Sequence, residues 1–405
     1  MASDRAYDIV LFGATGFTGR LVAHYLAEIS RNTQLRWALA GRNRSKLEWV
    51  RSEIAPALPA GAEVDILEAS SDDPAALSRI ASLSRVVLTT VGPYFKHGEP
   101  LVEACIRERA DYVDITGEPR FVNRLIERHD EAARLAGVRI VSCCGFDSIP
   151  HDLGTLFTVE KLPRNEPITV EAFVRAGGGS VSGGTWQSAL NEFGSDLSQA
   201  MARPWAQGKL PGGRHVEELP KRVRKEPELG GWVVPMPTID PQVVLRSARA
   251  LDLYGPDFRY SHNVVVGSIV NVGLGAMAVG AIVGLSQLGP TRSLLSKLRP
   301  SGEGPSADQR ARAWFQVTFR GQATSRSVLT RVSGGDPGYG ETAKMVAESA
   351  LCLAFDKDQL PPHVGVLTPA VAMGDALIKR LQAAGMRFEL LEGYTLPLKR
   401  ASERT

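Results

Sequence analysis

Three glycines spaced three residues apart, Gly13, Gly16 and Gly19, lie near the start of the chain, directly after an apolar run from Tyr7 to Phe12. The run predicts a buried parallel strand, and the helical period of the residues that follow predicts a helix beginning near Gly16. Such a helix start presents free backbone N–H groups, which bind pyrophosphate. We therefore predict a dinucleotide-binding turn. The alternative is a purely structural glycine-rich turn, which is common in α/β proteins.

A second apolar run, from Leu35 to Ala40, follows the first predicted helix, as a dinucleotide-binding unit requires. In folds specific for NAD, an acidic residue at the end of this strand binds the ribose hydroxyls. Here Arg42, Asn43 and Arg44 follow the strand, and the first carboxylate is Glu48. A guanidinium suits the 2′-phosphate of NADP. The sequence therefore favours NADP(H) over NAD(H), with solvated loop charges as the alternative interpretation of the arginines.

The alternation of apolar runs and helical segments continues through the first 150 residues. Further apolar runs lie at 63–67, 85–90, 111–115 and 138–142. Six strands that alternate with helices predict a doubly wound parallel sheet. Ligands bind beyond the carboxyl ends of such strands. We therefore expect the loops after the fourth, fifth and sixth strands to surround the nicotinamide of a bound dinucleotide.

The titratable residues on those three loops are Tyr94, Glu118, Asp147 and His151. A reductase that places a proton beside a hydride needs an acid or an ordered water nearby. The sequence does not choose among the four. Each also has an ordinary structural interpretation, since Tyr94 could pack on the cofactor, Glu118 could cap a helix and Asp147 could brace its loop.

The same loops carry a resemblance to a known family. The motifs are Val91-Gly92-Pro93-Tyr94, Thr116-Gly117-Glu118 and Gly145-Phe146-Asp147-Ser148-Ile149-Pro150-His151-Asp152. They resemble the signature loops of the saccharopine dehydrogenase-like oxidoreductases. The segment 365–377 resembles the closing segment of one branch, the trans-acting enoyl reductases of mycobacteria, and Ser182-Gly183-Gly184-Thr185 is similar to that branch too. The resemblance runs from Tyr7 to about Phe388 and implies NADPH as hydride donor.

The resemblance implies an α/β fold with a Rossmann-type doubly wound parallel sheet and a second α+β domain, inserted before C-terminal helices that return to the first domain. The expected divisions are 1–152 for the NADP-binding domain, 153–335 for a substrate or dimerisation domain, and 336–405 for the returning helices. Tyr94, Asp147 and Ser148 are the expected catalytic residues. The residues expected to contact the cofactor are Gly13, Ala14, Thr15, Gly16, Phe17, Thr18, Gly19, Arg42, Asn43, Val91, Gly92, Pro93, Tyr94 and Gly117.

The implied reaction is reduction of a carbon–carbon double bond conjugated to a thioester, in lipid biosynthesis, on an acyl chain carried by a polyketide synthase. Hydride would go to the β-carbon, and Tyr94, Ser148 or a loop N–H would stabilise the enolate or protonate the α-carbon. The lysine-pathway relatives bind an amino dicarboxylate, which needs fixed basic groups that these loops do not evidently supply. Two alternatives stay open: a saccharopine-type amino acid or imine dehydrogenase, and a non-catalytic NADP(H)-binding module associated with lipid or membrane.

The segment 260–291 contains no Asp, Glu, Lys or Arg. A run of this length is long enough to span a bilayer. Its glycines and polar residues argue against spanning, so membrane-surface contact, a homodimer contact and a buried helix are the stronger alternatives. The preceding segment 220–225 carries four cations. We expect an exposed loop there, on which an acidic acyl-carrier domain could dock.

Composition excludes several classes of protein. With 43% hydrophobic and 22% charged residues and a net charge of +3, the chain is an ordinary folded protein, and we expect no nucleic acid partner. The four cysteines lack Cys-x-x-Cys spacing, and the seven histidines form no ligand motif, so a reducing compartment and no metal are expected. No apolar signal segment opens the chain. We expect a cytoplasmic location, with contact at the inner face of the membrane as the alternative.

Overall fold

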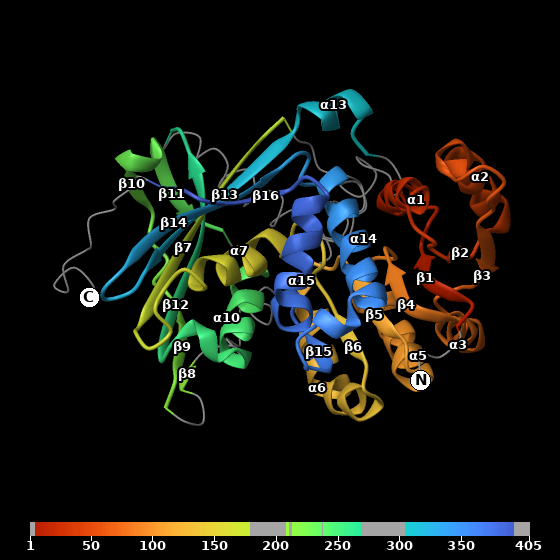
Figure 1. Cartoon of the computed structure of the whole chain (residues 1–405), viewed down its shortest axis with the longest axis horizontal. Helices are drawn as coiled ribbons and strands as arrows, with labels where there is room; N and C mark the ends of the chain where they lie inside the picture. The colour runs from red at the N-terminus through yellow and green to blue at the C-terminus, as the bar shows by residue number, and fades with distance from the viewer. Residues whose placement is uncertain (1–4, 179–207, 210–212, 237, 269–303, 393–405) are drawn as a thin grey trace, which may run out of the picture.

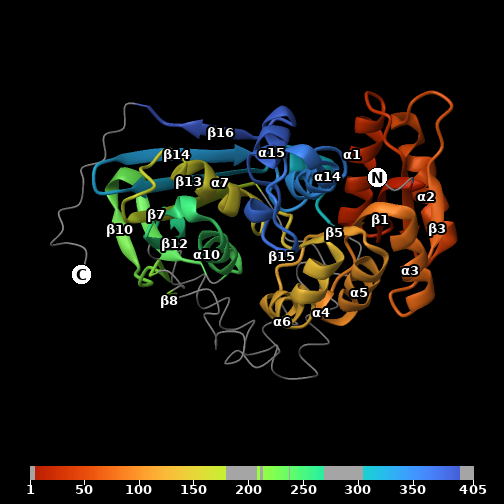
Figure 2. The same cartoon turned by 60° about the horizontal axis from the view of Figure 1, so that its bottom comes forward.

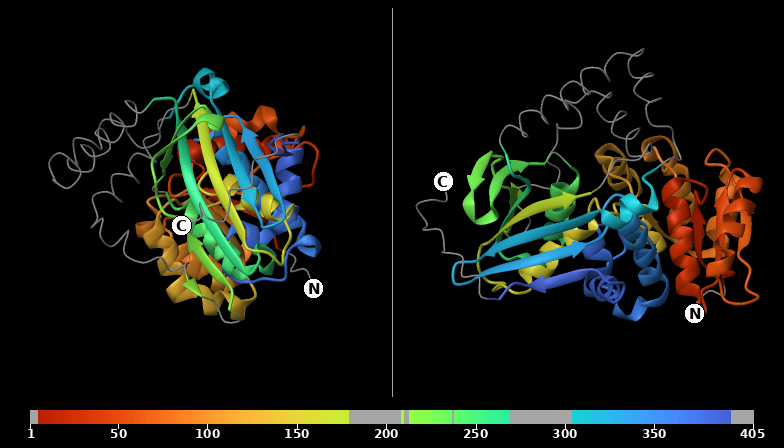
Figure 3. Two further views of the ribbon diagram at one scale, coloured as in Figure 1. Left: turned by 90° about the vertical axis from the view of Figure 1, so that its left-hand side faces the viewer. Right: turned by 90° about the horizontal axis from the view of Figure 1, so that it is seen from above.

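The structure is a computed structural model, and it describes residues 5–178, 208–209, 213–236, 238–268 and 304–392. The described residues form two sheets that lie side by side, each with its own helices (Figure 1). The helices α14 (Gly340–Phe355) and α15 (Pro369–Ala383) lie between the two sheets, and the view from above in Figure 3 shows the same arrangement.

The first sheet has seven parallel strands in the order β15-β6-β5-β4-β1-β2-β3. The strands are β1 (Tyr7–Phe12), β2 (Trp37–Gly41), β3 (Asp65–Glu68), β4 (Ser84–Thr89), β5 (Asp111–Asp114), β6 (Arg139–Val141) and β15 (Gly365–Leu367). The first six confirm the predicted alternation. The seventh strand, β15, was not predicted, because three residues are too few to show a period.

Helices cover both faces of this sheet, which is why its central strands are apolar throughout. Ile9 and Leu11 of β1 face one core, together with residues of α1 (Phe17–Ser30), α2 (Arg44–Ile54) and α14. Val10 and Phe12 face the other core. That second core is built with residues of α3 (Pro74–Leu83), α5 (Glu99–Glu108) and α6 (Pro119–Ala136), and the short α4 (Tyr94–His97) precedes α5. The doubly wound Rossmann-type sheet is confirmed.

The second sheet is mixed and follows the order β10-β11-β12-β7-β13-β14-β16, with β9 paired to β12 and β8 paired to β9. Its strands are β7 (Ile168–Gly177), β8 (Gly208–Lys209), β9 (His215–Glu218), β10 (Arg224–Glu226), β11 (Gly231–Pro235), β12 (Asp257–Val266), β13 (Trp314–Gln322), β14 (Ser327–Gly334) and β16 (Arg387–Leu390). The central pair β12 and β7 is parallel, whereas β13 and β14 form an antiparallel hairpin. The short helix α13 (Ala307–Arg312) leads into β13.

The helix α7 (Ile149–Val159) joins the two halves of the molecule, and α10 (Asp240–Ala250) packs beside it (Figure 2). The helix α7 lies very close to the second sheet, since a Cβ on its Gly154 would stand 2.4 Å from the ring of Phe319 in β13. In the C-terminal segment, α14 packs on the first sheet and β15 joins that sheet as an edge strand beside β6. The last strand, β16, joins the second sheet and pairs with β14. The predicted return of C-terminal helices to the first domain is confirmed.

Several predicted segments fall wholly or partly outside the described residues. Only the start of the uncharged segment, Tyr260 to Ser268, is described, and Tyr260 to Val266 belongs to β12. The motif at 182–185 is not among the described residues. Of the helices in the described part of the chain, none has the length and apolar character needed to cross a membrane. The segment 220–225 is not entirely a loop as predicted, because Arg224 and Lys225 begin β10.

Candidate active site

The glycine turn has the geometry that the sequence predicts. Gly13 has φ +92°, a backbone conformation that favours glycine. A Cβ on Gly19 would stand 2.2 Å from the Gly13 carbonyl oxygen, so only glycine allows α1 to lie this close to the turn. No side chain caps the first turn of α1, whose N-cap is Gly16. Backbone N–H groups are therefore available there for an anion.

Phe17 opens α1, and its ring is engaged within the protein. It lies 5.1 Å from the ring of Tyr339, edge to face, and the guanidinium of Arg310 lies 5.6 Å from its centroid. The side chain therefore ties the turn to the C-terminal half of the chain. Its predicted part in cofactor binding concerns its backbone N–H, which is at the helix start.

The residues after β2 divide into two roles. The Asn43 side chain accepts a hydrogen bond from the Lys46 N–H at 2.9 Å and so caps α2. Arg44 forms an ion pair with Glu48 at 3.1 Å. Arg42 is exposed and has no ion pair within the described residues. Of the two residues predicted here as cofactor contacts, Arg42 and Asn43, Arg42 therefore has a guanidinium that can bind a phosphate.

The loops after β4, β5 and β6 meet at the carboxyl edge of the sheet. Val91 Cγ2 would be 2.7 Å from a Cβ on Gly13, and the hydroxyl of Thr90 donates to the Gly13 carbonyl oxygen at 3.1 Å. A Cβ on Gly117 would lie 3.5 Å from Oδ2 of Asp147. The structure thus brings together the glycine turn and the loops that the sequence predicts to surround the nicotinamide.

The buried carboxylate of Asp114, which sequence reasoning missed, organises two of these loops. It accepts hydrogen bonds from the N–H groups of Thr116 and Cys143, at 2.9 and 3.1 Å, and from the hydroxyls of Tyr112 and Ser142, both at 2.9 Å. Burial raises the pKa of Asp114 to about 6, even though these donors lower it. The signal in the sequence was an aspartate within an apolar strand.

Tyr94 is buried, and its hydroxyl donates to the carbonyl of Thr89 at 3.2 Å. Burial, followed by the charge of Asp114, raises the pKa of Tyr94 well above its ordinary value. The backbone N–H of Tyr94 donates to Glu118 at 3.0 Å, so the Glu118 carboxylate caps the start of α4. These contacts favour structural roles for Tyr94 and Glu118 over proton donation.

Asp147 lies between β6 and α7 with its side chain exposed. Desolvation by the surrounding protein, followed by the negative charge of Asp240, raises the pKa of Asp147 to about 7, while the residue as a whole is exposed. A carboxylic acid that keeps its proton near neutral pH and is accessible to a substrate suits general acid catalysis.

Ser148, the next residue, is fully buried. Its Oγ has no hydrogen-bond partner among the described residues. Leaving a buried hydroxyl unpaired costs free energy, so such a group calls for an explanation, such as a ligand that completes its hydrogen bonding. The predicted catalytic residues Asp147 and Ser148 thus have features that suit catalysis, whereas Tyr94 is already engaged.

A buried cluster of two histidines and one aspartate lies where α7, α10 and β12 meet. Nδ1 of His151 is 2.8 Å from Oδ1 of Asp240, and Nε2 of His262 is 3.5 Å from Oδ2. The two imidazole centroids are 4.6 Å apart. Sequence reasoning named His151 but missed Asp240 and His262, because nothing in the sequence indicates that three distant segments meet at this point.

The cluster has a defined charge pattern. Burial by itself lowers the pKa of His151. The Asp240 carboxylate and smaller contributions from its surroundings together outweigh this effect, so the pKa of His151 is raised. Burial lowers the pKa of His262 to about 3. The pKa of Asp240 falls well below its usual range, because the two histidines outweigh its desolvation. The ion pair with Asp240 therefore favours a proton on His151 over one on His262.

Asp152 links three elements near the start of α7. Its Oδ2 accepts a hydrogen bond from the Ala370 N–H at 2.8 Å, at the start of α15. The hydroxyl of Ser247 on α10 also bonds to Asp152, and its Oγ lies 2.6 Å from that of Thr368. Burial raises the pKa of Asp152 to about 7 despite these donors.

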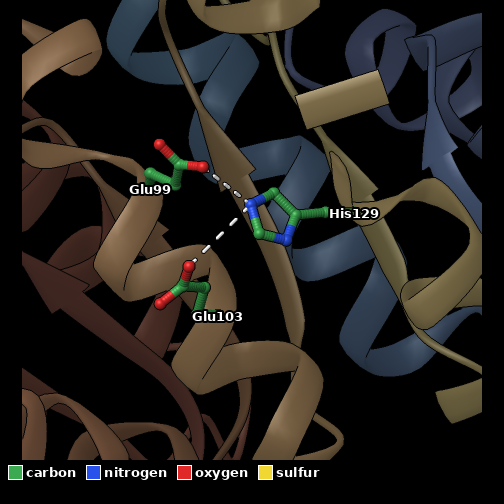
Figure 4. Close-up of side chains that lie close together, drawn as sticks. All are labelled: Glu99, Glu103 and His129. Carbon is green, nitrogen blue, oxygen red and sulfur yellow. Dashed lines mark hydrogen bonds and ion pairs between the residues drawn. The ribbon is translucent and has the colours of Figure 1, made fainter. Parts of the chain in front are cut away.

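One group of side chains in the described part of the chain is compact enough to hold a metal ion: Glu99, Glu103 and His129 (Figure 4). Nε2 of His129 lies 3.0 Å from Glu99 and 4.0 Å from Glu103. Arg124 and Arg128 pair with Glu99 as well, at 3.2 and 3.3 Å. Because cations already compensate Glu99, we interpret the group as an ion-pair network between α5 and α6.

Comparisons with known proteins agree with this geometry. The family model described as the saccharopine dehydrogenase NADP binding domain matches residues 9–141. A protein of Mycobacterium tuberculosis, provisionally named a trans-acting enoyl reductase, is 38% identical over 96% of this chain and 98% of its own length. A trans-acting enoyl reductase of Mycobacterium ulcerans is 34% identical over 95% and 98%, and the human saccharopine dehydrogenase-like oxidoreductase is 34% identical over 96% and 98%.

Among solved structures, apo saccharopine dehydrogenase (L-Glu forming) of Saccharomyces cerevisiae aligns over 95% of this chain and 100% of its own, with a TM-score of 0.52. At 12% sequence identity, this similarity concerns the fold alone. It extends over both sheets of the present structure, and therefore includes the second sheet as well as the dinucleotide-binding part.

Proposed function

Because this chain belongs to the saccharopine dehydrogenase-like oxidoreductases, and is thus an NADP-dependent oxidoreductase, we propose that it is an enoyl reductase acting on an acyl thioester. The observation that carries the proposal is the exposed residue Asp147, with a raised pKa, followed directly in the chain by Ser148 with its unpaired buried hydroxyl, on a loop at the carboxyl edge of the sheet. The relatives named trans-acting enoyl reductases, similar over nearly the whole chain, support the class of substrate.

The residues of the cofactor region fit NADP(H). Because Gly13 and Gly19 have no Cβ, the turn can lie close to Val91 and to the start of α1. No side chain caps this helix start, so its N–H groups can bind the pyrophosphate. Arg42 would bind the 2′-phosphate. When bound, NADPH supplies a hydride for the β-carbon of the enoyl thioester.

The site residues would then manage charge and the proton. Hydride addition moves the electron pair of the double bond toward the thioester oxygen, where the Ser148 hydroxyl can donate a hydrogen bond. Asp147, protonated near neutral pH, donates its proton to the α-carbon. Tyr94 keeps the loop in place through Thr89 and Glu118 instead of acting as the donor.

An acyl-carrier domain of a polyketide synthase is part of the proposal as the source of the thioester. The basic segment 220–225 is largely compensated, since Arg224 pairs with Glu171 at 2.6 Å and Lys221 pairs with Glu218 at 3.3 Å. Arg222 and Lys225 have no ion pair within the described ranges, so docking there would rest on these two cations. We also propose that the protein is cytoplasmic and that its uncharged segment, 260–291, contacts lipid at the inner face of the cell membrane.

The test is steady-state oxidation of NADPH with a crotonyl thioester of pantetheine, followed at the nicotinamide absorbance. We expect turnover with the thioester and none with saccharopine or a cyclic imine. Turnover of the imine or amino acid instead would favour the dehydrogenase alternative. Tight NADPH binding without turnover of either class would favour the non-catalytic module.

A further inference from the structure

Positive charge gathers around the ring of Phe17, the first residue of α1. The guanidinium of Arg310 lies 5.6 Å from the centroid of this ring, and that of Arg20 lies 5.9 Å from the same centroid. The first turn of α1 contains no acidic residue, and the N-terminus of a helix is itself a positive pole. Two cations and a helix start therefore meet at one aromatic ring beside the glycine turn.

Little negative charge within the described residues compensates these two cations. Arg20 has one carboxylate partner there, Glu53, at 3.9 Å, which is a long distance for an ion pair. Arg310 forms no ion pair with any described residue. Like charges that are held close together without counter-charge repel each other. A bound anion removes this repulsion, so the arrangement favours one.

Neutral contacts hold the guanidinium of Arg310 in place. Its Nη1 donates to the Pro305 carbonyl at 2.8 Å. The start of its helix, α13, is fixed by a capping box, in which the Ser306 hydroxyl accepts a hydrogen bond from the Gln309 N–H at 3.2 Å and the Gln309 side chain accepts one from the Ser306 N–H at 3.1 Å. Most of the N–H donors of this guanidinium thus have no acceptor among the described residues and can bind a further group.

The contacts of Phe17 place Arg310 at the carboxyl edge of the first sheet. A Cβ on Gly304, just before α13, would stand 2.4 Å from the Phe17 ring. Phe17 also meets Tyr339, which precedes α14. The hydroxyl of Thr342 in α14 accepts a hydrogen bond from a backbone N–H of the loop after β6, at 3.1 Å. In Figure 1, α13 lies at the end of the second sheet that is nearer to α1.

We propose that Arg310 binds the pyrophosphate of the dinucleotide, together with the backbone N–H groups at the start of α1. A planar guanidinium suits two phosphate oxygens. Arg310 lies outside residues 9–141, which match the NADP-binding family model, so a residue of the second half of the chain completes the cofactor site. The inference rests on the cofactor part of the proposed function and does not depend on the acyl substrate.

A first experiment measures binding with no substrate present. Arg310→Gln removes the charge from the full chain, and nicotinamide fluorescence gives the dissociation constants of NADPH and NADH. We expect both constants to rise about tenfold, because both dinucleotides carry the pyrophosphate, and the difference from the wild type to shrink at high salt. Unchanged affinity for both would overturn the proposal. A loss confined to NADPH would overturn it too, because Arg310 would then contact the 2′-phosphate.

Arg312→Gln is the matched control. Arg312 ends the same helix, is exposed, and has no ion pair or ring contact among the residues that the structure describes. This variant should bind both dinucleotides as the wild type does. Equal losses in Arg310→Gln and Arg312→Gln would show that the general charge of α13 acts, and would refute a specific contact of Arg310.

The alternative is a purely structural role, in which Arg310 only packs on Phe17 and joins the two halves of the chain. Arg310→Lys separates the two, because it keeps the charge but loses the planar group that stacks on the ring. We expect the lysine variant to bind NADPH more tightly than Arg310→Gln, with the same urea unfolding midpoint of the cofactor-free protein in both. A lysine variant that binds no better than the glutamine variant would overturn the proposal.

Hydrogen exchange of the wild-type protein gives a test that needs no variant. NADPH should slow the exchange of amides in 304–312, because a bound pyrophosphate fixes Arg310 and its helix. Slower exchange at the glycine turn without any change in 304–312 would contradict the proposal. A wild type that binds NADPH in this way but reduces no enoyl thioester would refute the proposed reaction and leave the role of Arg310 intact.

Discussion

At the scale of single residues, Arg42 is the side chain that we expect to decide between NADP(H) and NAD(H). It is exposed and lacks an ion pair among the described residues, whereas Arg44 is held by Glu48. A charge-assisted contact with a phosphate typically contributes about 1.5 to 3 kcal/mol. We expect Arg42→Ala to weaken NADPH binding about tenfold or more, with little change in NADH binding, as measured by nicotinamide fluorescence.

The matched control is Arg44→Ala, which removes a neighbouring guanidinium already paired with Glu48 at 3.1 Å. It should change the dissociation constant of NADPH much less than Arg42→Ala does. Equal losses in the two variants would mean that the general positive charge after β2, and not a specific contact of Arg42, sets the cofactor preference.

A second prediction at this scale concerns Asp147. As a general acid it must be protonated, so the wild-type kcat should fall as the pH rises through about 7, which is the pKa of its carboxyl group. Asp147→Asn keeps the size of the side chain but has no acidic proton. We expect kcat to drop about 100-fold and the fall through this pH range to disappear, with unchanged NADPH binding.

The pH dependence of hydride transfer, compared between the wild type and Asp147→Asn with the enoyl thioester as substrate, provides the check. An asparagine variant with near wild-type kcat would assign the proton to another donor, such as ordered water. Tyr94→Phe is informative beside it, because the hydroxyl of Tyr94 is bonded to Thr89 and its removal should affect kcat far less.

At the scale of elements, the contact of α1 with the glycine turn is the tightest requirement of the cofactor region. A Cβ on Gly19 would meet the Gly13 carbonyl oxygen at 2.2 Å, and this backbone atom cannot move without opening the turn. Gly19→Ala should therefore destabilise the protein by about 1 to 3 kcal/mol and weaken NADPH binding further. Urea unfolding and a binding titration measure the two effects.

A suitable control for that variant is Gly267→Ala, because a Cβ on Gly267 would meet no atom within 4 Å. Its unfolding midpoint and NADPH affinity should stay close to those of the wild type. If Gly19→Ala behaved in the same way, the close approach of α1 to the turn would not be required for binding.

At the scale of the whole molecule, Asp152 joins α7, α10 and α15, which lie far apart in the sequence. Burial raises its pKa to about 7, above the ordinary aspartate value of 3.8. The folded state therefore binds the proton more tightly than the unfolded state, and the stability that this provides is lost as the pH rises from about 4 to about 7. Asp152→Asn should reduce the fall in stability across that range.

Urea unfolding of both proteins at about pH 5 and about pH 8 measures this difference. The comparison with the variant is essential, because the buried Asp114, whose pKa is also raised, contributes a dependence of the same sign. An identical change in unfolding free energy for wild type and Asp152→Asn would show that Asp152 does not keep its proton in the folded state.

The dinucleotide-binding half was accessible to sequence reasoning because its signals are local. The structure confirms the strand from Tyr7 to Phe12, the glycine turn after it and the alternation of strands and helices up to β6. These features depend on residues that are neighbours in the sequence, so the sequence pattern predicts them. The strands β15 and β16 were missed. Each is only three or four residues long and owes its existence to pairing with β6 and β14.

In the candidate site, too, the sequence predicted the residues that follow a strand but not their contacts. Asp147, Ser148 and Tyr94 were all predicted as site residues because they follow predicted strands, and this stays a prediction. The sequence could not show that the Tyr94 hydroxyl is bonded to Thr89, nor that Asp114 collects donors from two loops. Which polar groups a side chain meets depends on packing, and packing is not local.

The sequence by itself determined a dinucleotide fold and its NADP preference and predicted the edge at which ligands bind, because glycine conformations and apolar periods act over a few residues. The tertiary structure decided the electrostatics of that edge. His151, Asp240 and His262 come from three segments that only meet when α7, α10 and β12 pack together, and burial then sets which of them holds a proton. Charge states depend on the summed surroundings of a group in space, and these exist only once the chain is folded.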